Sequence, residues 1–160
     1  KMLRFKNDRF YVTTTRFNNE TYKQNEQYRI AKRIDGCVYG TPQEMPNYIP
    51  IGAKVFVFEM NNQTNKVQGI GYLKNRLYTR KRFNIYKDRN YNRYSYIGKH
   101  RVDRYDMTKD MRKELKVIEE LIFKGKGHLK RGQGITSFTQ EKLDKNKKLI
   151  WKFLVSIFID

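Results

Sequence analysis

The sequence is poor in several residue types, and each shortage excludes a class of protein. Only one of the 160 residues is cysteine, so no internal disulfide can form and a disulfide-stabilised secreted scaffold is excluded. That cysteine and the two histidines cannot supply the four ligands of a structural zinc site. We therefore expect no metal and no cofactor, and a reducing intracellular compartment fits the cysteine content best.

Long apolar runs are also missing. The longest stretch, Leu149 to Ile159, is about half of the ~20 residues that a membrane-spanning helix needs, and Lys152 and Ser156 interrupt it. The sequence does not begin with a charged segment followed by an apolar one, as a secretory leader would. We expect neither membrane insertion nor secretion, which leaves the cytoplasm or the nucleus as the predicted location.

Acidic residues are few, because 16 Asp and Glu stand against 35 Lys and Arg. The resulting formal charge of +19 favours binding of polyanions through counterion release, and nucleic acid is the commonest polyanion that proteins bind. The length, with 12 Tyr and 10 Phe, is sufficient for one compact domain. We predict a single domain over residues 1–160 and leave its oligomeric state open.

Local patterns predict an α+β chain. The expected elements are a strand over 9–15, a helix over 18–34, an irregular loop over 36–52, a hairpin of strands over 55–59 and 67–73, a strand over 91–102 and a helix over 107–125. Gly69 and Gly71 inside a strand indicate either the close approach of another backbone or a tight bend, and a tight bend favours a small, twisted, mostly antiparallel β-barrel flanked by helices. Residues 140–160 fit a helix or a buried strand equally well.

No catalytic constellation is complete. Tyr96-Ile-Gly98, followed by Arg101 and Arg104, corresponds to half of the GIY-YIG nuclease signature. The other half would have to be Gly69-Ile-Gly-Tyr72, which departs from the signature and lies too far upstream. We predict that the protein has no catalytic residues and is not an enzyme, with a metal-dependent nuclease as the enzyme alternative.

Two basic segments favour nucleic-acid binding. Residues 74–104 carry 11 Lys and Arg against two acidic residues, interleaved with tyrosines whose rings can stack on bases. Residues 124–135 combine four glycines with five cationic or titratable side chains, so that backbone N–H groups and cations can approach an anion together. This second segment is not a Walker loop, because it lacks the Gly-Lys-Ser/Thr ending.

Several motifs together suggest a family. They are Arg9-Phe-Tyr-Val-Thr-Thr14, Cys37-Val-Tyr-Gly-Thr-Pro42, Val55-Phe-Val-Phe-Glu59, Lys66-Val-Gln-Gly-Ile-Gly71 and Arg131-Gly-Gln-Gly-Ile135. In this order they resemble the YTH domain and, more broadly, the EVE and PUA-like group, over roughly residues 9–136. The resemblance implies a small twisted β-barrel packed by helices, with residues 137–160 as a C-terminal extension packed on it.

The same resemblance implies a module that reads a base, typically N6-methyladenosine in single-stranded RNA, in an aromatic pocket without chemistry. Tyr39 stands where the family has its first cage tryptophan, and Tyr94 or Tyr96 stands near the second. A tyrosine cage offers less area than a tryptophan cage, so we expect only a weak preference for methylation. The implied base-pocket residues are Thr14, Thr15, Asn18, Tyr39, Gly40, Tyr94 and Tyr96.

Flanking phosphates would be held by cations. Arg131, assisted by Lys130, corresponds to a phosphate-holding position of the family. The predicted phosphate contacts are Lys99, Arg101, Lys126, His128, Lys130 and Arg131. RNA is the favoured partner and DNA the less favoured one.

The alternative to an RNA reader is a virus-encoded virion or assembly protein whose basic surface binds the genome or an acidic partner. Its docking surface would be Trp151, Phe153, Leu154 and Phe158. Packing of these four side chains in the protein's own core is the competing interpretation.

Overall fold

Strand β3 (Lys54–Asn61) is the central strand of the structure, and its side chains are buried on both faces. Phe56, Phe58 and Met60 point to one face. Val55 and Val57 point to the other, as the two-residue period of a strand requires. The structure, a computed structural model, describes residues 9–158. Its two cores therefore meet across a single strand.

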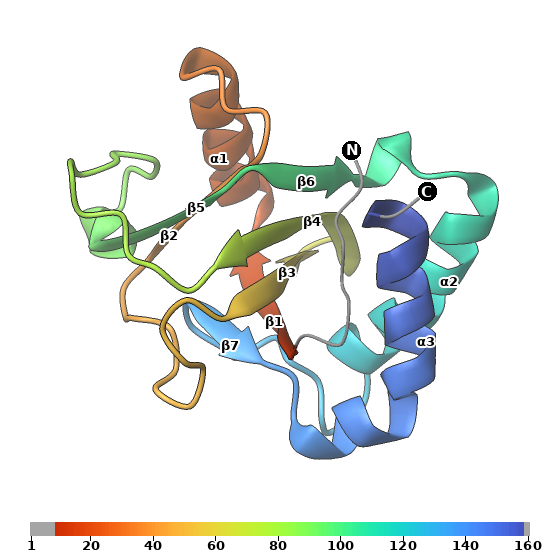
Figure 1. Ribbon diagram of the computed structural model, residues 1–160. Helices are drawn as coiled ribbons and strands as arrows, with labels where there is room; N and C mark the ends of the chain where they lie inside the picture. The colour runs from red at the N-terminus through yellow and green to blue at the C-terminus, as the bar shows by residue number, and fades with distance from the viewer. Residues whose placement is uncertain (1–8, 159–160) are drawn as a thin grey trace.

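The strands form two sheets (Figure 1). The larger sheet contains, in spatial order, β6 (His100–Asp103), β4 (Lys66–Lys74), β3, β1 (Phe10–Phe17) and β7 (Ile135–Ser137). The smaller sheet is the antiparallel pair β2 (Cys37–Thr41) and β5 (Tyr94–Gly98). The helices are α1 (Asn19–Ala31), α2 (Lys109–Phe123) and α3 (Gln140–Phe158), with two 3-10 turns, η1 (Arg89–Asn92) and η2 (Arg104–Asp106).

The α+β class is confirmed, but the predicted barrel is wrong. Within residues 9–158 the five-stranded sheet is mixed and open, with β6 and β7 at its two edges. β1 lies parallel to β3, with Phe10 opposite Lys54 and Phe17 opposite Asn61. A parallel pair needs a crossover connection, and here α1 and β2 supply it.

Gly69 and Gly71 of β4 make room for side chains and do not mark a barrel bend. A Cβ on Gly71 would collide with the Tyr39 hydroxyl and with Cys37 Sγ. A Cβ on Gly69 would collide with the Arg101 guanidinium. The two glycines thus let the Tyr39, Cys37 and Arg101 side chains approach the backbone of β4 closely.

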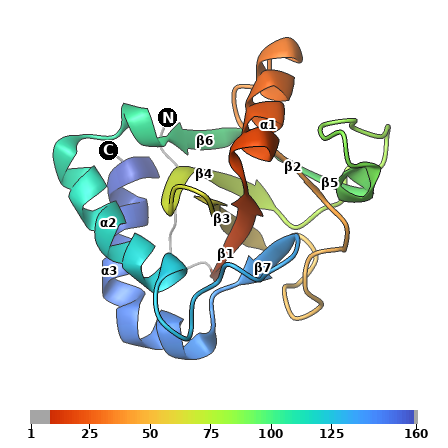
Figure 2. The same ribbon diagram turned by 180° about the vertical axis from the view of Figure 1, so that it is seen from behind.

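Helices α2 and α3 cover one face of the large sheet, as both views show (Figures 1 and 2). Buried α2 side chains such as Leu115 and Ile122 belong to the same core cluster as Phe58 of β3. The undecided C-terminal segment is a helix, whose buried residues are Ile150, Phe153, Leu154 and Phe158. The interpretation of Phe153, Leu154 and Phe158 as core is therefore confirmed, and Trp151 is half-buried. Trp151 stacks on Phe10 at a centroid distance of 4.8 Å.

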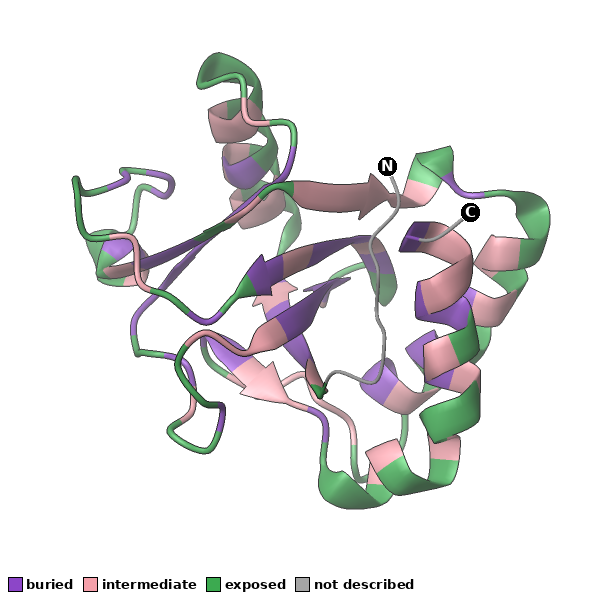
Figure 3. Cartoon of the chain, viewed as in Figure 1, coloured by how far each residue is buried: buried purple, intermediate pink, exposed green. Residues whose placement is uncertain are grey.

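Helix α1 is held mainly by its polar groups. The predicted start is confirmed, because Asn18 caps the helix by accepting from the Thr21 N–H at 2.8 Å. Asn25 is the one buried residue of α1, and its side-chain Nδ2 donates to the Val38 carbonyl oxygen at 2.7 Å and to the Tyr86 hydroxyl at 3.0 Å. The outer turns of α1 are exposed (Figure 3).

The predicted hairpin of β3 and β4 and the helix that follows Met107 are also confirmed. Across residues 9–158, none of the helices combines the length and the apolar character that crossing a membrane requires.

Replacing Phe153 by alanine should lower the free energy of unfolding by about 3–5 kcal/mol, because the ring is fully buried between α3 and the sheet. Val117→Ala on the exposed face of α2 should change it by less than about 0.5 kcal/mol. Urea unfolding followed by circular dichroism measures both. Equal effects of the two substitutions would contradict the packing of α3 described above.

Candidate nucleic-acid interface

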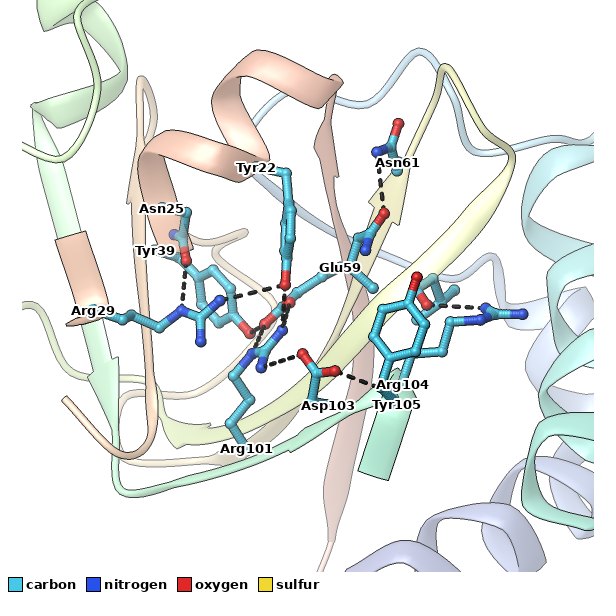
Figure 4. Close-up of polar contacts among 12 residues, drawn as sticks. Tyr22, Asn25, Arg29, Tyr39, Glu59, Asn61, Arg101, Asp103, Arg104 and Tyr105 are labelled. Atoms are coloured by element: carbon cyan, nitrogen blue, oxygen red, sulfur yellow. Dashed lines mark hydrogen bonds and ion pairs between the residues drawn. The ribbon is translucent and has the colours of Figure 1, made fainter. Parts of the chain in front are cut away.

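A buried ion pair lies between the two sheets (Figure 4). Glu59 of β3 continues the inward row of Val55 and Val57, and its side chain is only 1% exposed. Both Glu59 oxygens accept from Arg101 of β6, at 2.7 and 2.9 Å. The Tyr39 hydroxyl of β2 donates to Glu59 at 2.6 Å. Arg101 also donates to the Tyr22 hydroxyl of α1 at 3.0 Å. We call these four residues the Glu59 network.

Burial and neighbouring charge fix the ionisation states of Tyr39 and Arg101. Burial raises the pKa of Tyr39 well above its usual value, and the neighbouring Glu59 carboxylate raises it further. Burial lowers the pKa of Arg101, but attraction to Glu59 outweighs this effect and leaves it raised. The tyrosine therefore stays neutral and the arginine stays charged, which satisfies the buried carboxylate.

Three predicted site residues, Tyr39, Tyr96 and Arg101, have buried side chains and therefore cannot contact RNA as predicted. Tyr39 and Tyr96 face each other in the register of β2 and β5, but each is only 1% exposed. The Tyr96 hydroxyl accepts from the Met45 N–H at 2.7 Å. Both rings therefore belong to the core and leave no slot between them for a base. Arg101 is likewise unable to hold a phosphate, because its side chain is 5% exposed and bound to Glu59.

The residues of the nuclease half-signature make separate structural contacts. Arg104 is paired with Glu119 of α2, and its guanidinium also donates to the Val67 carbonyl oxygen at 3.0 Å. Tyr96 and Arg101 are occupied by the core contacts just described. The structure does not bring the three side chains together at a common surface.

An open cleft of about 450 Å³ lies where β1 ends and α1 begins. We call it the α1 cleft. Its wall residues include Thr15, Phe17, Asn18, Gly40, Tyr86 and Tyr91. Arg16 and Lys87 also line it, as do Glu20 and Asp88, so its formal charges cancel. A cleft of this size and balance suits an uncharged planar group better than a bare phosphate.

The walls of the α1 cleft are fixed by hydrogen bonds. Tyr86 is buried, and the side-chain amide of Asn25 binds its hydroxyl. Gly40 lies so close to the Tyr91 carbonyl oxygen that a Cβ there would collide with it. The Gln24 side chain joins α1 to the loop before β5, because its Oε1 accepts from the Lys87 N–H at 3.2 Å. The cleft is therefore preformed rather than assembled by a ligand.

Asn62 supplies an acceptor at this cleft that has no partner. Its Nδ2 donates to the Lys130 carbonyl oxygen at 3.0 Å, which fixes the orientation of the amide. Its Oδ1 is buried and accepts no hydrogen bond from the described residues. An unpaired buried acceptor costs about 1–3 kcal/mol, so a ligand N–H placed there would be favoured.

The basic glycine-rich segment, residues 124–135, leads from α2 to β7 (Figure 2). Gly134 lines the cleft, and the Lys130 carbonyl oxygen accepts from Arg16 at 3.4 Å. Lys126 and Arg131 are exposed, whereas Lys130 is half-buried and its Nζ donates to Asn65 at 2.8 Å. His128 Nδ1 accepts from the Lys130 N–H at 3.2 Å.

The structure thus gathers three of the seven predicted base-pocket residues, Thr15, Asn18 and Gly40, at one cleft. Thr14 is buried, and its hydroxyl lies 3.3 Å from that of Thr136. Tyr94 is half-buried beneath Arg93, away from the cleft walls. Lys99 is exposed at the bend between β5 and β6.

Phe17, Asn62, Tyr86 and Tyr91 line the cleft but are missing from the predicted pocket. Tyr86 and Tyr91 lie in the basic segment whose tyrosines are predicted from the sequence to be able to stack on bases, so that pattern could have placed them in the predicted pocket. No local pattern indicates that Phe17 or Asn62 would meet them.

Residues 9–158 contain no group of three or more His, Cys, Asp or Glu side chains that could hold a metal ion. Comparison of the chain with protein-family models, curated proteins and solved structures finds no significant match. The resemblance to YTH domains therefore stays a prediction from the motifs.

Glu59→Gln should lower the free energy of unfolding by about 3–5 kcal/mol, because the buried Arg101 charge would keep only its pair with the partly exposed Asp103. The control is Glu120→Gln in the exposed pair with Lys124, which should stay within about 1 kcal/mol of wild type. Urea titration of both variants provides the measurement. A small loss for Glu59→Gln would mean that the network does not hold the sheets together.

Cys37 should resist alkylation in the folded protein. Burial raises the pKa of its thiol to about 12, and the nearby Glu59 carboxylate adds to this effect. An unfolded cysteine ionises near pH 8.5. The thiol's contribution to stability is therefore complete below about pH 8.5 and is lost as the pH rises toward 12. Iodoacetamide labelling at pH 8, monitored by mass spectrometry, should be slow in buffer and fast in denaturant. Rapid labelling of the folded chain would show that Cys37 is accessible.

Proposed function

We propose that the protein binds single-stranded RNA, holding one base in the α1 cleft and neighbouring phosphates on the basic residues around it. The observation that carries the proposal is a preformed cleft of about 450 Å³, with tyrosine and phenylalanine rings in its walls, in a chain of formal charge +19. Pockets of roughly 300–1,000 Å³ with aromatic walls and a few polar groups are typical ligand sites.

The polar groups of the cleft favour a base that carries N–H donors. Asn62 Oδ1 accepts no hydrogen bond from residues 9–158, and a base with an exocyclic amino group can donate to it. The Asn18 side chain and the Thr15 hydroxyl also line the cleft and can bind the remaining edge of the base. Uracil lacks an exocyclic amino group, but its ring N3–H can donate to the same acceptor.

Phosphates belong at the rim. Lys126 and Arg131 are exposed on the glycine-rich segment that borders the cleft, and this segment has no acidic residue to oppose them. Each neutralised phosphate of a single strand contributes about −0.7 to the slope of log affinity against log salt. Binding should therefore weaken steeply as salt is added.

Stacking, rather than methyl recognition, should dominate the affinity. One buried methyl group contributes about 0.8 kcal/mol, whereas each stacked base contributes about 1–3 kcal/mol. Among the rings that line the cleft, Phe17 and Tyr86 are buried in the core and Tyr91 is half-buried, so Tyr91 is the ring available for stacking. The cage positions Tyr39 and Tyr96 do not line the cleft. The proposal is a reader of single-stranded RNA with at most a weak preference for N6-methylation.

Tyr91→Ala should weaken binding of a fluorescein-labelled single-stranded RNA by about 5- to 100-fold, because one stacking face is lost. Tyr105→Ala is the matched control, since Tyr105 is 80% exposed and is not part of the α1 cleft. Fluorescence anisotropy at two salt concentrations measures both affinities, and a thermal melt shows that the Tyr91 variant is folded.

Equal affinities of the two tyrosine variants, or an affinity that does not respond to salt, would refute the proposal. Tighter binding of a DNA strand of the same sequence would support the α1 cleft as a base-binding site, but with DNA rather than RNA as the ligand. RNA-independent self-association of the chain, with both variants unchanged, would instead favour the assembly protein.

A further inference from the structure

A second groove, of about 510 Å³, lies between the first residues of β1 and helix α3. We call it the β7 groove. Residues that define it include Arg9, Tyr11, Tyr48, Ser137, Lys147 and Trp151. Tyr48 comes from the loop between β2 and β3, which lies beside β7 in both ribbon views (Figures 1 and 2).

The β7 groove and the α1 cleft lie at opposite ends of one short edge strand. Gly134, just before β7, lines the α1 cleft, and Ser137, the last residue of β7, lines the β7 groove. The pairing of Ser137 with Thr13 and of Ile135 with Thr15 fixes this direction. Three residues of strand span about 10 Å, so a short polymer can reach both cavities.

The β7 groove has the chemistry of a nucleotide site. Tyr48 is 64% exposed, so its ring is available for stacking, and Tyr11 beside it is half-buried. The exposed cations Arg9 and Lys147 outnumber the one acidic lining residue, Asp144. This combination of ring and cation binds single-stranded nucleic acid without regard to sequence.

An independent observation also points to a ligand in the β7 groove. The Ser137 Oγ is buried and has no hydrogen-bond partner among the described residues. A hydroxyl can donate to a phosphate or base oxygen and can accept from a base N–H, so a nucleotide would satisfy it. Such a contact removes the cost of an unpaired buried polar group.

We infer that the β7 groove is a second nucleotide site for the same RNA strand, which crosses β7 after leaving the α1 cleft. This inference rests on the proposed function. The occupant is a stretch of RNA, because the groove is cationic and lies one short strand away from the first site. In the bound state one base stacks on Tyr48 while Arg9 and Lys147 hold phosphates.

The test compares a mononucleotide with a longer strand. Calorimetry with adenosine monophosphate reports the α1 cleft, because the open β7 groove adds affinity mainly when a strand already bound in the cleft tethers the next base to it. Anisotropy with a single-stranded RNA of about six nucleotides reports both sites. Tyr48→Ala and Lys147→Glu should each weaken the longer strand by about tenfold and leave the mononucleotide unchanged. Tyr91→Ala should weaken both ligands, and Tyr105→Ala should weaken neither. Tyr48 and Lys147 are exposed, so these variants should fold.

The outcomes separate the inference from the proposed function. Wild-type affinity of the Tyr48 and Lys147 variants for the longer strand, with Tyr91→Ala still weakened, overturns the second site but keeps the first. That result would leave the groove to another occupant, such as a peptide. If neither ligand binds the wild-type protein, the proposed function itself fails. A loss of mononucleotide binding in Tyr48→Ala would also overturn the inference, because the two sites would not be distinct.

Discussion

The pairing of Glu59 with Arg101 is the interaction on which the rest of the structure depends. It occurs inside the protein, where an unpaired charge would be costly, so both partners and the Tyr39 hydroxyl must be present together. The participating residues come from β3, β6, β2 and α1, which are far apart along the chain. One carboxylate therefore sets how the small sheet and the first helix lie on the large sheet. The side chains fit only because Gly69 and Gly71 leave the surface of β4 bare.

This constraint explains how a cleft can be rigid when much of its wall is loop. The Tyr22 contact anchors the first half of α1, and the Asn25 amide ties the middle of the helix to β2 and to Tyr86. The loop carrying Tyr86 is shaped by Asn92, whose amide accepts from the Ile85 and Tyr86 N–H groups and donates to the Tyr86 carbonyl oxygen. The Asn92 amide thus supplies hydrogen bonds that a neighbouring strand would otherwise provide. A nucleobase would thus meet a surface whose conformational entropy has already been lost.

The sequence predicts the individual elements well and their assembly poorly. Caps, turns and the alternation in β3 are local, so the hairpin and helices α1 and α2 could be read from neighbouring residues, whereas the pattern of α3 left helix and strand undecided. The parallel pairing of β1 with β3 depends on a crossover, and no local pattern encodes it. The prediction of the base pocket around Tyr39 was wrong for a related reason. Every residue of β2 is buried, so its pattern does not indicate which side Tyr39 faces. One clue was present in the sequence, because Glu59 continues the row of Val55 and Val57 and a charge in that row needs a partner.

The position of β7 has a consequence for the order in which the chain can fold. β1 is the first described strand, yet one of its edges stays unpaired until Ile135–Ser137 has been synthesised. A ribosome-bound chain can close the hairpin of β3 and β4 early, but it must hold β1 open while most of the remaining sequence emerges. Pairing between such distant segments slows folding and leaves a strand edge available to wrong partners. The surplus of positive charge opposes that misassociation, since nascent chains of like sign repel one another.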